Sequence, residues 1–421
     1  MDSVTKLLLA ATPLCVVTSS SVVIEPPSAF DTFWNGPSGG CNPALPLANY
    51  SSIRVNEAQA FIGEEIACFY QIGAFPTVSA SQNATACWTS HTPNCSWNPW
   101  DEINATANGG VPQAANISLH KAQVVSDVES AIPDPDFSGL LVVDWETWRP
   151  LASENYDGLS CYTEYSRRLV SADPDWKDKN ASAIAAEGVR RFNAGAAAFF
   201  TATVDAVKSI RPNARVGFYS QGINQPASAG STVQNELLWL WQSVDALFPS
   251  IYPRSTNVEA EATWITDLIN GAIISADLAQ NASTASGHPK RPAVFPYARA
   301  LVSPGSTIEP FTAGLLATQV QIAAGLGADG VVLWGSSGDY HGNGCTVVAG
   351  ELESFAGDTM DTCAMNRINC SRSECNGHGR CVDYDAANLE EICLSDATST
   401  ATCRCDVGYA GDKCEQNASS A

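Results

Sequence analysis

Basic residues are scarce in this chain. Its 421 residues include 22 Lys and Arg against 44 Asp and Glu, which gives a formal net charge of −22 at pH 7. Non-specific nucleic-acid binding is therefore excluded, because it depends on Lys and Arg displacing the counterions of the phosphates. The same acidity disfavours a polyanionic ligand unless the binding site is locally less acidic than the whole protein.

Long hydrophobic runs are also missing. No segment reaches the ~18 apolar residues that a membrane-spanning helix needs. A shorter apolar stretch at residues 7–17 follows Lys6 and precedes small residues at 18–21, an order typical of a secretory signal peptide. We therefore expect residues 1–21 to be a signal peptide, no transmembrane segment, and a secreted protein.

Histidine is rare as well, and cysteine is not. The 5 histidines show no metal-binding spacing, so we predict no metal site and no cofactor. The 15 cysteines argue against a reducing compartment. Removing Cys15 with the signal peptide leaves 14, an even number that can pair completely. Asn-x-Ser/Thr sequons are also consistent with an exported glycoprotein, at Asn49, Asn83, Asn94, Asn104, Asn116, Asn180, Asn281, Asn369 and Asn417.

Short apolar runs alternate with longer helical segments between residues 22 and 362. The predicted strands are 66–70, 139–143, 215–219, 250–252, 293–297 and 330–334, and the predicted helices are 182–209, 233–247, 258–278 and 311–326. This alternation predicts an α/β fold, and it favours a (β/α) TIM-like barrel, regular or irregular, over an open sheet. In such a barrel the carboxyl ends of the strands form the active-site face.

Two further regions lack this alternation. Residues 79–110 read as a long surface insertion that a Cys87–Cys95 bridge would hold together. The cysteine-rich tail at 363–416 contains a C-x-C and a Gly-Tyr-x-Gly turn, and it resembles an EGF-like domain. That resemblance implies the pairs Cys370–Cys381, Cys375–Cys403 and Cys405–Cys414. A zinc site is a weaker alternative, because only His378 lies nearby.

The strand predicted at 139–143 ends in Asp144-Trp145-Glu146. Residues two apart on a strand point the same way, so Asp144 and Glu146 would share one space with Cα atoms about 6.5 Å apart. Close carboxylates do not ionise independently, and one pKa rises, which suits a general acid. A solvated acidic turn or a helix cap is the alternative interpretation of this motif.

Two carboxylates on one strand cannot easily flank a glycosidic bond from opposite faces, as two-carboxylate hydrolysis requires. The pair instead fits one acid and one helper. The nucleophile would then come from the substrate, as the 2-acetamido group of an N-acetylhexosamine, in the substrate-assisted exception to the two-carboxylate rule.

The sequence resembles the hyaluronidase family, glycoside hydrolase family 56, over most of residues 30–415. The matching motifs are residues 33–38, 109–113, 144–146, 216–219, 238–241, 248–252 and 330–334, together with the EGF-like tail. One departure is the run 220–224, where the family usually has Phe-Pro-Asp-Cys-Tyr-Asn and this chain has Ser-Gln-Gly-Ile-Asn.

The resemblance implies a role for each of seven residues. These are Glu146 as proton donor, Asp144 and Tyr252 as the groups that orient and polarise the acetamido group, and Tyr219, Trp334, Asn35 and Ser250 as substrate contacts. It also implies a Cys41–Cys345 bridge. The partners of Cys68, Cys161, Cys363 and Cys393 stay open. Tyr219, Tyr252 and Trp334 also fit a role in the barrel core, and Asn35 also fits a structural role.

Three functions follow, two of them enzymatic and one of another class. The first is an endoglycosidase that hydrolyses β-1,4 N-acetylhexosaminide bonds of hyaluronan, and also of chondroitin, with retention of configuration. The second is a chitinase-like glycosidase on a neutral polymer, which suits the charge but would normally place Asp where Val142 stands. The third is a non-catalytic glycan-binding or adhesion protein. The expected partner is a polysaccharide, and the sequence predicts no oligomeric state.

Overall fold

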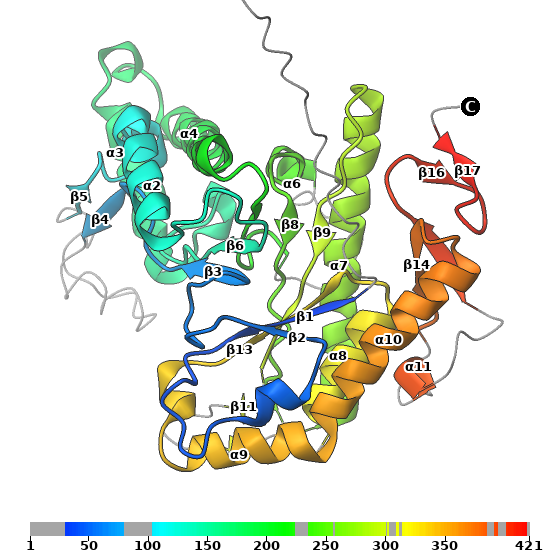
Figure 1. Ribbon diagram of the computed structural model, residues 1–421. Helices are drawn as coiled ribbons and strands as arrows, with labels where there is room; N and C mark the ends of the chain where they lie inside the picture. The colour runs from blue at the N-terminus through cyan, green and yellow to red at the C-terminus, as the bar shows by residue number, and fades with distance from the viewer. Residues whose placement is uncertain are drawn as a thin grey trace, which may run out of the picture.

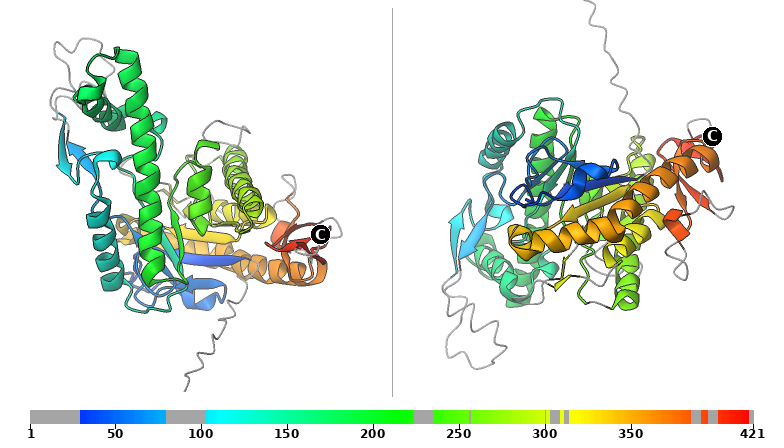
Figure 2. Two further views of the ribbon diagram at one scale, coloured as in Figure 1. Left: turned by 90° about the horizontal axis from the view of Figure 1, so that it is seen from above. Right: turned by 60° about the horizontal axis from the view of Figure 1, so that its bottom comes forward.

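The computed structural model describes residues 30–79, 103–223, 235–255, 257–299, 301–302, 309–310, 314–384, 391–394 and 401–418. The predicted signal peptide at 1–21 and the predicted Cys87–Cys95 bridge lie outside the described residues. Helices surround a set of parallel strands, and the cysteine-rich tail lies at the opposite end of the molecule from α2, α3 and α4 (Figures 1 and 2).

Short parallel strands form the centre of the protein. One sheet has the order β3 (Ile66–Phe69), β6 (Leu140–Val143) and β7 (Arg215–Phe218), and another has the order β10 (Tyr297–Arg299), β13 (Gly330–Trp334), β1 (Asp31–Asn35) and β2 (Ile53–Val55). β8 (Ala246–Leu247) and β9 (Ala293–Val294) form a parallel pair between them. Isolated parallel bridges join Tyr219 to Phe248 and Ser250 to Tyr297, so the strands follow one another around the centre.

Two apolar layers pack on the two faces of these strands. On β6, Leu140 and Val142 belong to an inner cluster, whereas Leu141 and Val143 belong to the larger cluster beneath the helices. This alternation follows from the strand period of two residues. The inner cluster draws on seven strands or their ends, through Phe33, Ile66, Cys68, Leu140, Val142, Ala246, Phe248, Phe295, Tyr297 and Val332. A sheet buried on both faces is typical of helix-covered parallel strands.

The helices follow the strands as the α/β pattern predicts. They are α2 (Ile117–Ala131), α3 (Ser160–Ser171), α4 (Ala181–Ile210), α6 (Leu238–Ser243), α7 (Val258–Ala285), α8 (Leu315–Gly325), α9 (Asn343–Glu351) and α10 (Gly357–Glu374). Three of them begin after an asparagine whose side-chain oxygen accepts a hydrogen bond from the first turn: Asn116, Asn180 and Asn257. Asparagine is a favoured N-cap because it satisfies one of the free N–H groups there. Among the described residues, no helix is long and apolar enough to cross a membrane.

The strand predicted at 250–252 is wrong. The strand in this part of the chain is β8 (Ala246–Leu247), and Ser250 makes only an isolated bridge. Pro249 and Pro253 flank the segment, and proline supplies no N–H group to a ladder. The predicted helix 233–247 is correspondingly shorter, since α6 ends at Ser243.

The insertion predicted at 79–110 has paired ends. β4 (Thr77–Ser79), at its start, forms an antiparallel pair with β5 (Asn104–Ala107), which lies near its end. A second short antiparallel pair joins β11 (Leu301–Val302) to β12 (Glu309–Pro310). Both pairs lie outside the parallel strands of the centre.

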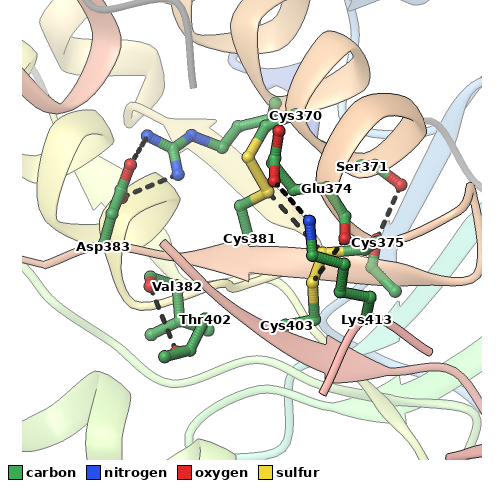
Figure 3. Close-up of a disulfide and its surroundings, with 12 residues drawn as sticks. Cys370, Ser371, Glu374, Cys375, Cys381, Val382, Asp383, Thr402, Cys403 and Lys413 are labelled. Carbon is green, nitrogen blue, oxygen red and sulfur yellow. Dashed lines mark hydrogen bonds and ion pairs between the residues drawn. A yellow bond between two sulfur atoms is a disulfide. The ribbon is translucent and has the colours of Figure 1, made fainter. Parts of the chain in front are cut away.

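The tail is built from small strands and disulfides. β14 (Gly379–Val382) pairs with β15 (Thr402–Cys405), β16 (Tyr409–Ala410) pairs with β17 (Gln416–Asn417), and α11 spans Glu391–Leu394. The structure contains every predicted bridge that falls on described residues: Cys41–Cys345, Cys370–Cys381, Cys375–Cys403 and Cys405–Cys414. Figure 3 shows two of them beside the Glu374–Lys413 ion pair. Cys363 pairs with Cys393, which the sequence left open.

The even number of cysteines would allow complete pairing, but two cysteines whose partners the sequence left open do not pair. Cys68 and Cys161 are free and buried. Cys68 faces the inner apolar cluster. A buried thiol behaves there as a small apolar side chain and needs no partner.

The tail is joined to the central body by charged groups. Arg380 forms ion pairs with Asp329 at 2.6 Å and with Asp406 at 2.7 Å. Arg404 donates hydrogen bonds to the carbonyl oxygens of Leu326 and Gly327, at the turn between α8 and β13. The predicted boundary between residues 362 and 363 falls within α10, and the division into domains stays a prediction.

Candidate active site

The carboxyl ends of β3, β6 and β7 lie side by side. Their register pairs Phe69 with Val143 and Val143 with Phe218, so the next residues along the chain emerge at one edge. The Asp144 N–H donates to the Phe69 carbonyl at 2.9 Å, and the Tyr219 N–H donates to the Val143 carbonyl at 3.0 Å. Polar side chains from distant parts of the sequence therefore meet at this edge.

Aromatic side chains from three strand ends and from the segment after β8 complete the group. The Tyr252 ring stacks on the Trp334 ring with centroids 5.5 Å apart, and the Tyr219 ring lies 6.3 Å from the Tyr252 ring. The Trp334 indole N–H donates a hydrogen bond to the Tyr70 hydroxyl at 2.9 Å. A row of ring faces and hydroxyl groups suits a sugar, which presents both apolar faces and hydroxyl groups.

Asp144 is the most unusual side chain in this group. Its Oδ1 atom is buried and has no hydrogen-bond partner among the described residues. Burial and, to a lesser extent, the nearby charge of Glu146 raise the pKa of Asp144 to about 7, while Arg149 acts in the opposite direction. A buried carboxyl group without a donor is costly, and such groups cluster at functional sites.

Glu146 is accessible. The residue is exposed, and its carboxylate forms no ion pair among the described residues, whereas Trp145 beside it is buried against Phe75 and Phe218. Asp144 is half-buried, so burial alternates along the three residues as the sequence predicts for a strand end. The Glu146 carboxyl group is therefore free to meet a ligand.

The turn after Glu146 is held by one buried side chain, Asn155. Its Oδ1 atom accepts a hydrogen bond from the Arg149 N–H at 2.8 Å. Its amide donates to the carbonyl oxygens of Arg149 at 3.0 Å and of Leu151 at 2.8 Å. The Arg149 guanidinium in turn donates to the Glu146 carbonyl at 3.2 Å. Asn155 thus fixes the backbone that carries the two acids, a role with no signal in the sequence.

Tyr219, Ser250 and Tyr252 lie together in this group. Burial raises the pKa of Tyr219 to about 12, although hydrogen bonds to Ser250 and Tyr252 oppose this. Burial also raises the pKa of Tyr252 well above its usual range. Both hydroxyl groups therefore keep their protons near neutral pH and can donate hydrogen bonds.

Asn35 is close to the group but makes its contacts with the protein. It is fully buried, and its amide donates to the Phe61 carbonyl at 3.1 Å. Its Oδ1 atom lies 3.5 Å from the Tyr297 hydroxyl oxygen. The contact between Asn35 and substrate stays a prediction.

Tyr70 is a site residue that the sequence reasoning missed. It is 44% exposed, follows β3 directly, and packs edge-on against Phe61. The available signal was its position, because it ends the predicted strand 66–70 as Tyr219 ends 215–219.

Metal-binding residues are not grouped here. In the part of the chain that the structure describes, no three His, Cys, Asp or Glu side chains lie close enough together to hold a metal ion. The site consists of carboxyl, hydroxyl and aromatic groups, and these can transfer protons and bind sugars.

Comparisons with known proteins point to one family. The family model described as Hyaluronidase, glycoside hydrolase family 56, matches residues 97–405. Hyaluronidase-1 of Homo sapiens is 29% identical over 376 residues, which cover 85% of this chain and 79% of that protein. The hyaluronidase of Apis mellifera is 30% identical over 353 residues, which cover 80% of this chain and 85% of that protein.

The fold is similar to a solved structure as well. The crystal structure of bee venom hyaluronidase in complex with a hyaluronic acid tetramer matches with a TM-score of 0.64 and 25% sequence identity. The match covers 79% of this chain and 98% of that chain. Family model, relatives and fold agree, and the chain belongs to the hyaluronidase family.

Proposed function

We propose that the protein is a retaining endoglycosidase that hydrolyses the β-1,4 N-acetylhexosaminide bonds of hyaluronan, with chondroitin as a second substrate. The observation that carries this proposal is the pair of acids at the end of β6, one with a buried unpartnered oxygen and one accessible. Relatives named hyaluronidases, one of them solved with a hyaluronic acid tetramer, support this choice of substrate.

Asp144 binds the acetamido group of the sugar. Its buried Oδ1 atom lacks a donor, and the acetamido N–H supplies one, which turns the acetamido oxygen toward the anomeric carbon. The protonated hydroxyl of Tyr252 assists by donating a hydrogen bond to the same group. The substrate thereby provides the nucleophile that a second carboxylate provides in other retaining enzymes.

Glu146 transfers the proton. The acetamido oxygen forms a bond to the anomeric carbon while the glycosidic bond breaks, and Glu146 donates its proton to the departing oxygen. Glu146 then accepts a proton from the water that attacks the same carbon and opens the cyclic intermediate. Two inversions at one carbon give overall retention of configuration.

We also infer that the central strands form a closed barrel. The gap in hydrogen bonding lies between β1 and β3, and the Phe61 carbonyl spans it by accepting hydrogen bonds from the Asn35 side chain and from the Cys68 N–H. On the other side, β7 and β8 approach so closely that a Cβ at Gly217 would lie 2.1 Å from the Ala246 carbonyl oxygen. These contacts support a barrel of TIM-like type.

The proposal also covers the fold of the cysteine-rich tail and the export of the protein from the cell. We infer that the tail is an EGF-like domain because six of its cysteines pair first to third, second to fourth and fifth to sixth. These six are Cys370, Cys375, Cys381, Cys403, Cys405 and Cys414. We infer secretion from the apolar segment at 7–17 and from the disulfides, which persist in oxidising compartments.

A neutral N-acetylglucosamine polymer is the second candidate substrate, because a net charge of −22 repels a polyanion. The experiment compares wild type and Glu146→Gln on hyaluronan, chondroitin and chitin oligosaccharides by reducing-end release. Exposed Glu129 on α2 provides the matched control, Glu129→Gln. We expect hyaluronan cleavage by wild type and the control, and a loss of about 10²–10⁴ in Glu146→Gln with binding retained. Cleavage of chitin alone would exclude hyaluronan as the substrate, and full activity of Glu146→Gln would exclude the mechanism.

A further inference from the structure

Arg254 lies two residues beyond Tyr252 in the chain and is exposed. The backbone between them is anchored, because the Ile251 N–H donates to the Tyr297 carbonyl at 3.0 Å and both Ile251 and Pro253 are buried. Two residues advance the chain by at most about 7 Å. The Arg254 side chain therefore begins close to the ring that stacks on Trp334.

The guanidinium of Arg254 is held in place without being enclosed. Its Cζ atom lies 3.7 Å from the centroid of the Trp264 ring on α7, yet the side chain is 61% exposed. Stacking uses one face of the planar group and leaves the N–H groups at its edge available. The side chain is thus ordered before any ligand arrives.

The ion-pair partner of Arg254 leaves these N–H groups unused. Glu261 is buried, and its Oε2 atom lies 4.0 Å from Arg254 Nε, which is beyond hydrogen-bond distance. The Glu261 Oε1 atom accepts a hydrogen bond from the Ser255 hydroxyl at 2.8 Å. Among the described residues, no side chain or carbonyl accepts a hydrogen bond from Arg254.

Arg299 differs from Arg254 in how its N–H groups are used. Its guanidinium also lies over a site ring, 5.1 Å from the Trp334 centroid. Its N–H groups, however, are directed to the buried carboxylate of Asp339 at 2.7 and 2.9 Å. Arg299 is occupied by the protein, whereas Arg254 is stacked, exposed and without a hydrogen-bond acceptor.

We infer that Arg254 binds the carboxylate of a uronic acid residue next to the N-acetylhexosamine held at Asp144. This inference rests on the proposed function and names the part of the substrate that the site selects. A guanidinium offers two parallel N–H donors that match a carboxylate. In a protein of net charge −22, one fixed cation at the edge of the site gives the local attraction that a polyanion requires.

A purely structural role for Arg254 would join its loop to α7 through the Trp264 ring and would not depend on the charge of the ligand. The two roles differ in one measurable respect. Loss of the charge should weaken binding of a polymer with carboxylates and leave unchanged the binding of the same polymer without them.

The test compares wild type, Arg254→Gln and Arg254→Lys in hyaluronan hydrolysis. Hyaluronan whose carboxylates are reduced to primary alcohols serves as a competitive inhibitor. Arg190→Gln on α4 is the matched control, because Arg190 is 68% exposed and remote in sequence from the site residues. We expect Arg254→Gln to raise KM for hyaluronan about tenfold, which corresponds to about 1.4 kcal/mol, with kcat within about twofold. The KM of Arg254→Lys should lie between those of wild type and Arg254→Gln, and the KM of Arg190→Gln should match that of wild type.

The inhibition constant of the reduced polymer and the salt dependence of kcat/KM distinguish the two roles of Arg254. Arg254→Gln should leave the inhibition constant of the reduced polymer unchanged and make kcat/KM less sensitive to salt. An unchanged KM for hyaluronan, or an equal rise in KM and in the inhibition constant, would overturn the assignment while the proposed function stands. If wild type does not cleave hyaluronan at all, the proposed function fails, and the assignment of Arg254 fails with it.

Discussion

The carboxyl group of Asp144 combines burial with an open hydrogen-bonding position. Its Oδ1 atom has no partner among the described residues, and burial together with Glu146 raises its pKa to about 7. Stability alone would favour an uncharged side chain there, because it costs free energy to remove a charged carboxylate from water. The acid is therefore retained at the expense of stability, as is common for groups in active sites.

The raised pKa of Asp144 predicts how the stability of the protein depends on pH. The pKa of Asp144 is about 7 in the folded protein and near 3.8 when unfolded. Between these values the unfolded chain loses its proton and the folded chain keeps it, so stability falls as pH rises from about 4 to about 7 and stays lowered above that range. We expect Asp144→Asn to raise the free energy of unfolding at pH 8 by on the order of 1–3 kcal/mol. Urea unfolding at pH 8 measures it, and a less stable Asp144→Asn protein would contradict this explanation.

The same carboxyl group predicts how activity depends on pH. Burial and the nearby charge of Glu146 raise the pKa of Asp144 to about 7, so Asp144 loses its proton as pH rises through about 7. The charged form of Asp144 stabilises the positive charge that the acetamido group gains as it attacks, so kcat/KM should rise as pH increases from about 5 to about 7. A pH profile of wild type against Arg190→Gln checks this. A kcat/KM that stays constant between about pH 5 and pH 7 would show that ionisation of Asp144 does not limit the reaction.

At the scale of elements, the turn after β6 depends on Asn155, which is buried and makes three hydrogen bonds to the turn's own backbone. Loss of a buried hydrogen-bonding group costs about 1–3 kcal/mol when its partners stay buried. The turn carries Glu146, so its displacement acts on catalysis as well as on stability.

We expect Asn155→Ala to lower kcat by about tenfold or more with little change in KM, since the substrate contacts at Tyr252 and Trp334 come from other elements. Steady-state kinetics on a sample shown to be folded by circular dichroism measures this. Asn155→Asp keeps the oxygen that accepts from the Arg149 N–H and should lose less activity. Equal kinetics for Asn155→Ala and wild type would show that the turn needs no such support.

The elements that the sequence predicted well are those with uniform composition. The runs that form β6 and β13 are continuous and apolar, as expected for strands buried on both faces. β1 was missed because Asp31, Thr32 and Asn35 make it appear polar, although all five of its residues are buried. Asp144, Glu146, Tyr219 and Trp334 could be proposed from the sequence because each follows or ends such a run, and their roles stay predictions.

Other features of the site depend on contacts between distant residues, which local patterns do not contain. Asn155 forms hydrogen bonds with the backbone of its own loop, and Arg254 stacks on the Trp264 ring of α7. Cys68 stays unpaired because it belongs to the inner apolar cluster. Cysteine connectivity likewise cannot be derived from spacing alone. Only the assembled fold shows these roles.

At the scale of the whole molecule, the tail is packed into the catalytic body rather than tethered to it. The Arg380 side chain is 13% exposed and pairs with Asp329, whose side chain is 3% exposed. α10 runs without interruption from Gly357 to Glu374, and the Cys363–Cys393 bridge links it to α11 (Figure 1). A buried ion pair and the region around the Cys363–Cys393 bridge therefore join the tail to the central body, although its other buried cysteines form an apolar cluster of their own.

This arrangement predicts coupled unfolding. Removing one partner of a buried ion pair leaves the other charge uncompensated, so Arg380→Gln should lower the free energy of unfolding by about 3 kcal/mol. The double variant Arg380→Gln, Asp329→Asn should regain part of this loss. Thermal inactivation and the loss of near-ultraviolet dichroism should coincide in every variant. A separate low-temperature transition of the tail, with activity retained, would show that the tail is an independent domain.

The central claim is that the sugar's own acetamido oxygen attacks the anomeric carbon while Glu146 donates the proton. Proton NMR of the reducing end formed in the first minutes of hyaluronan cleavage tests it most directly. The account predicts that the new reducing end appears first as the β-anomer and then equilibrates with the α-anomer. A first product with the α configuration would require direct attack by water from the opposite face, and it would contradict the account.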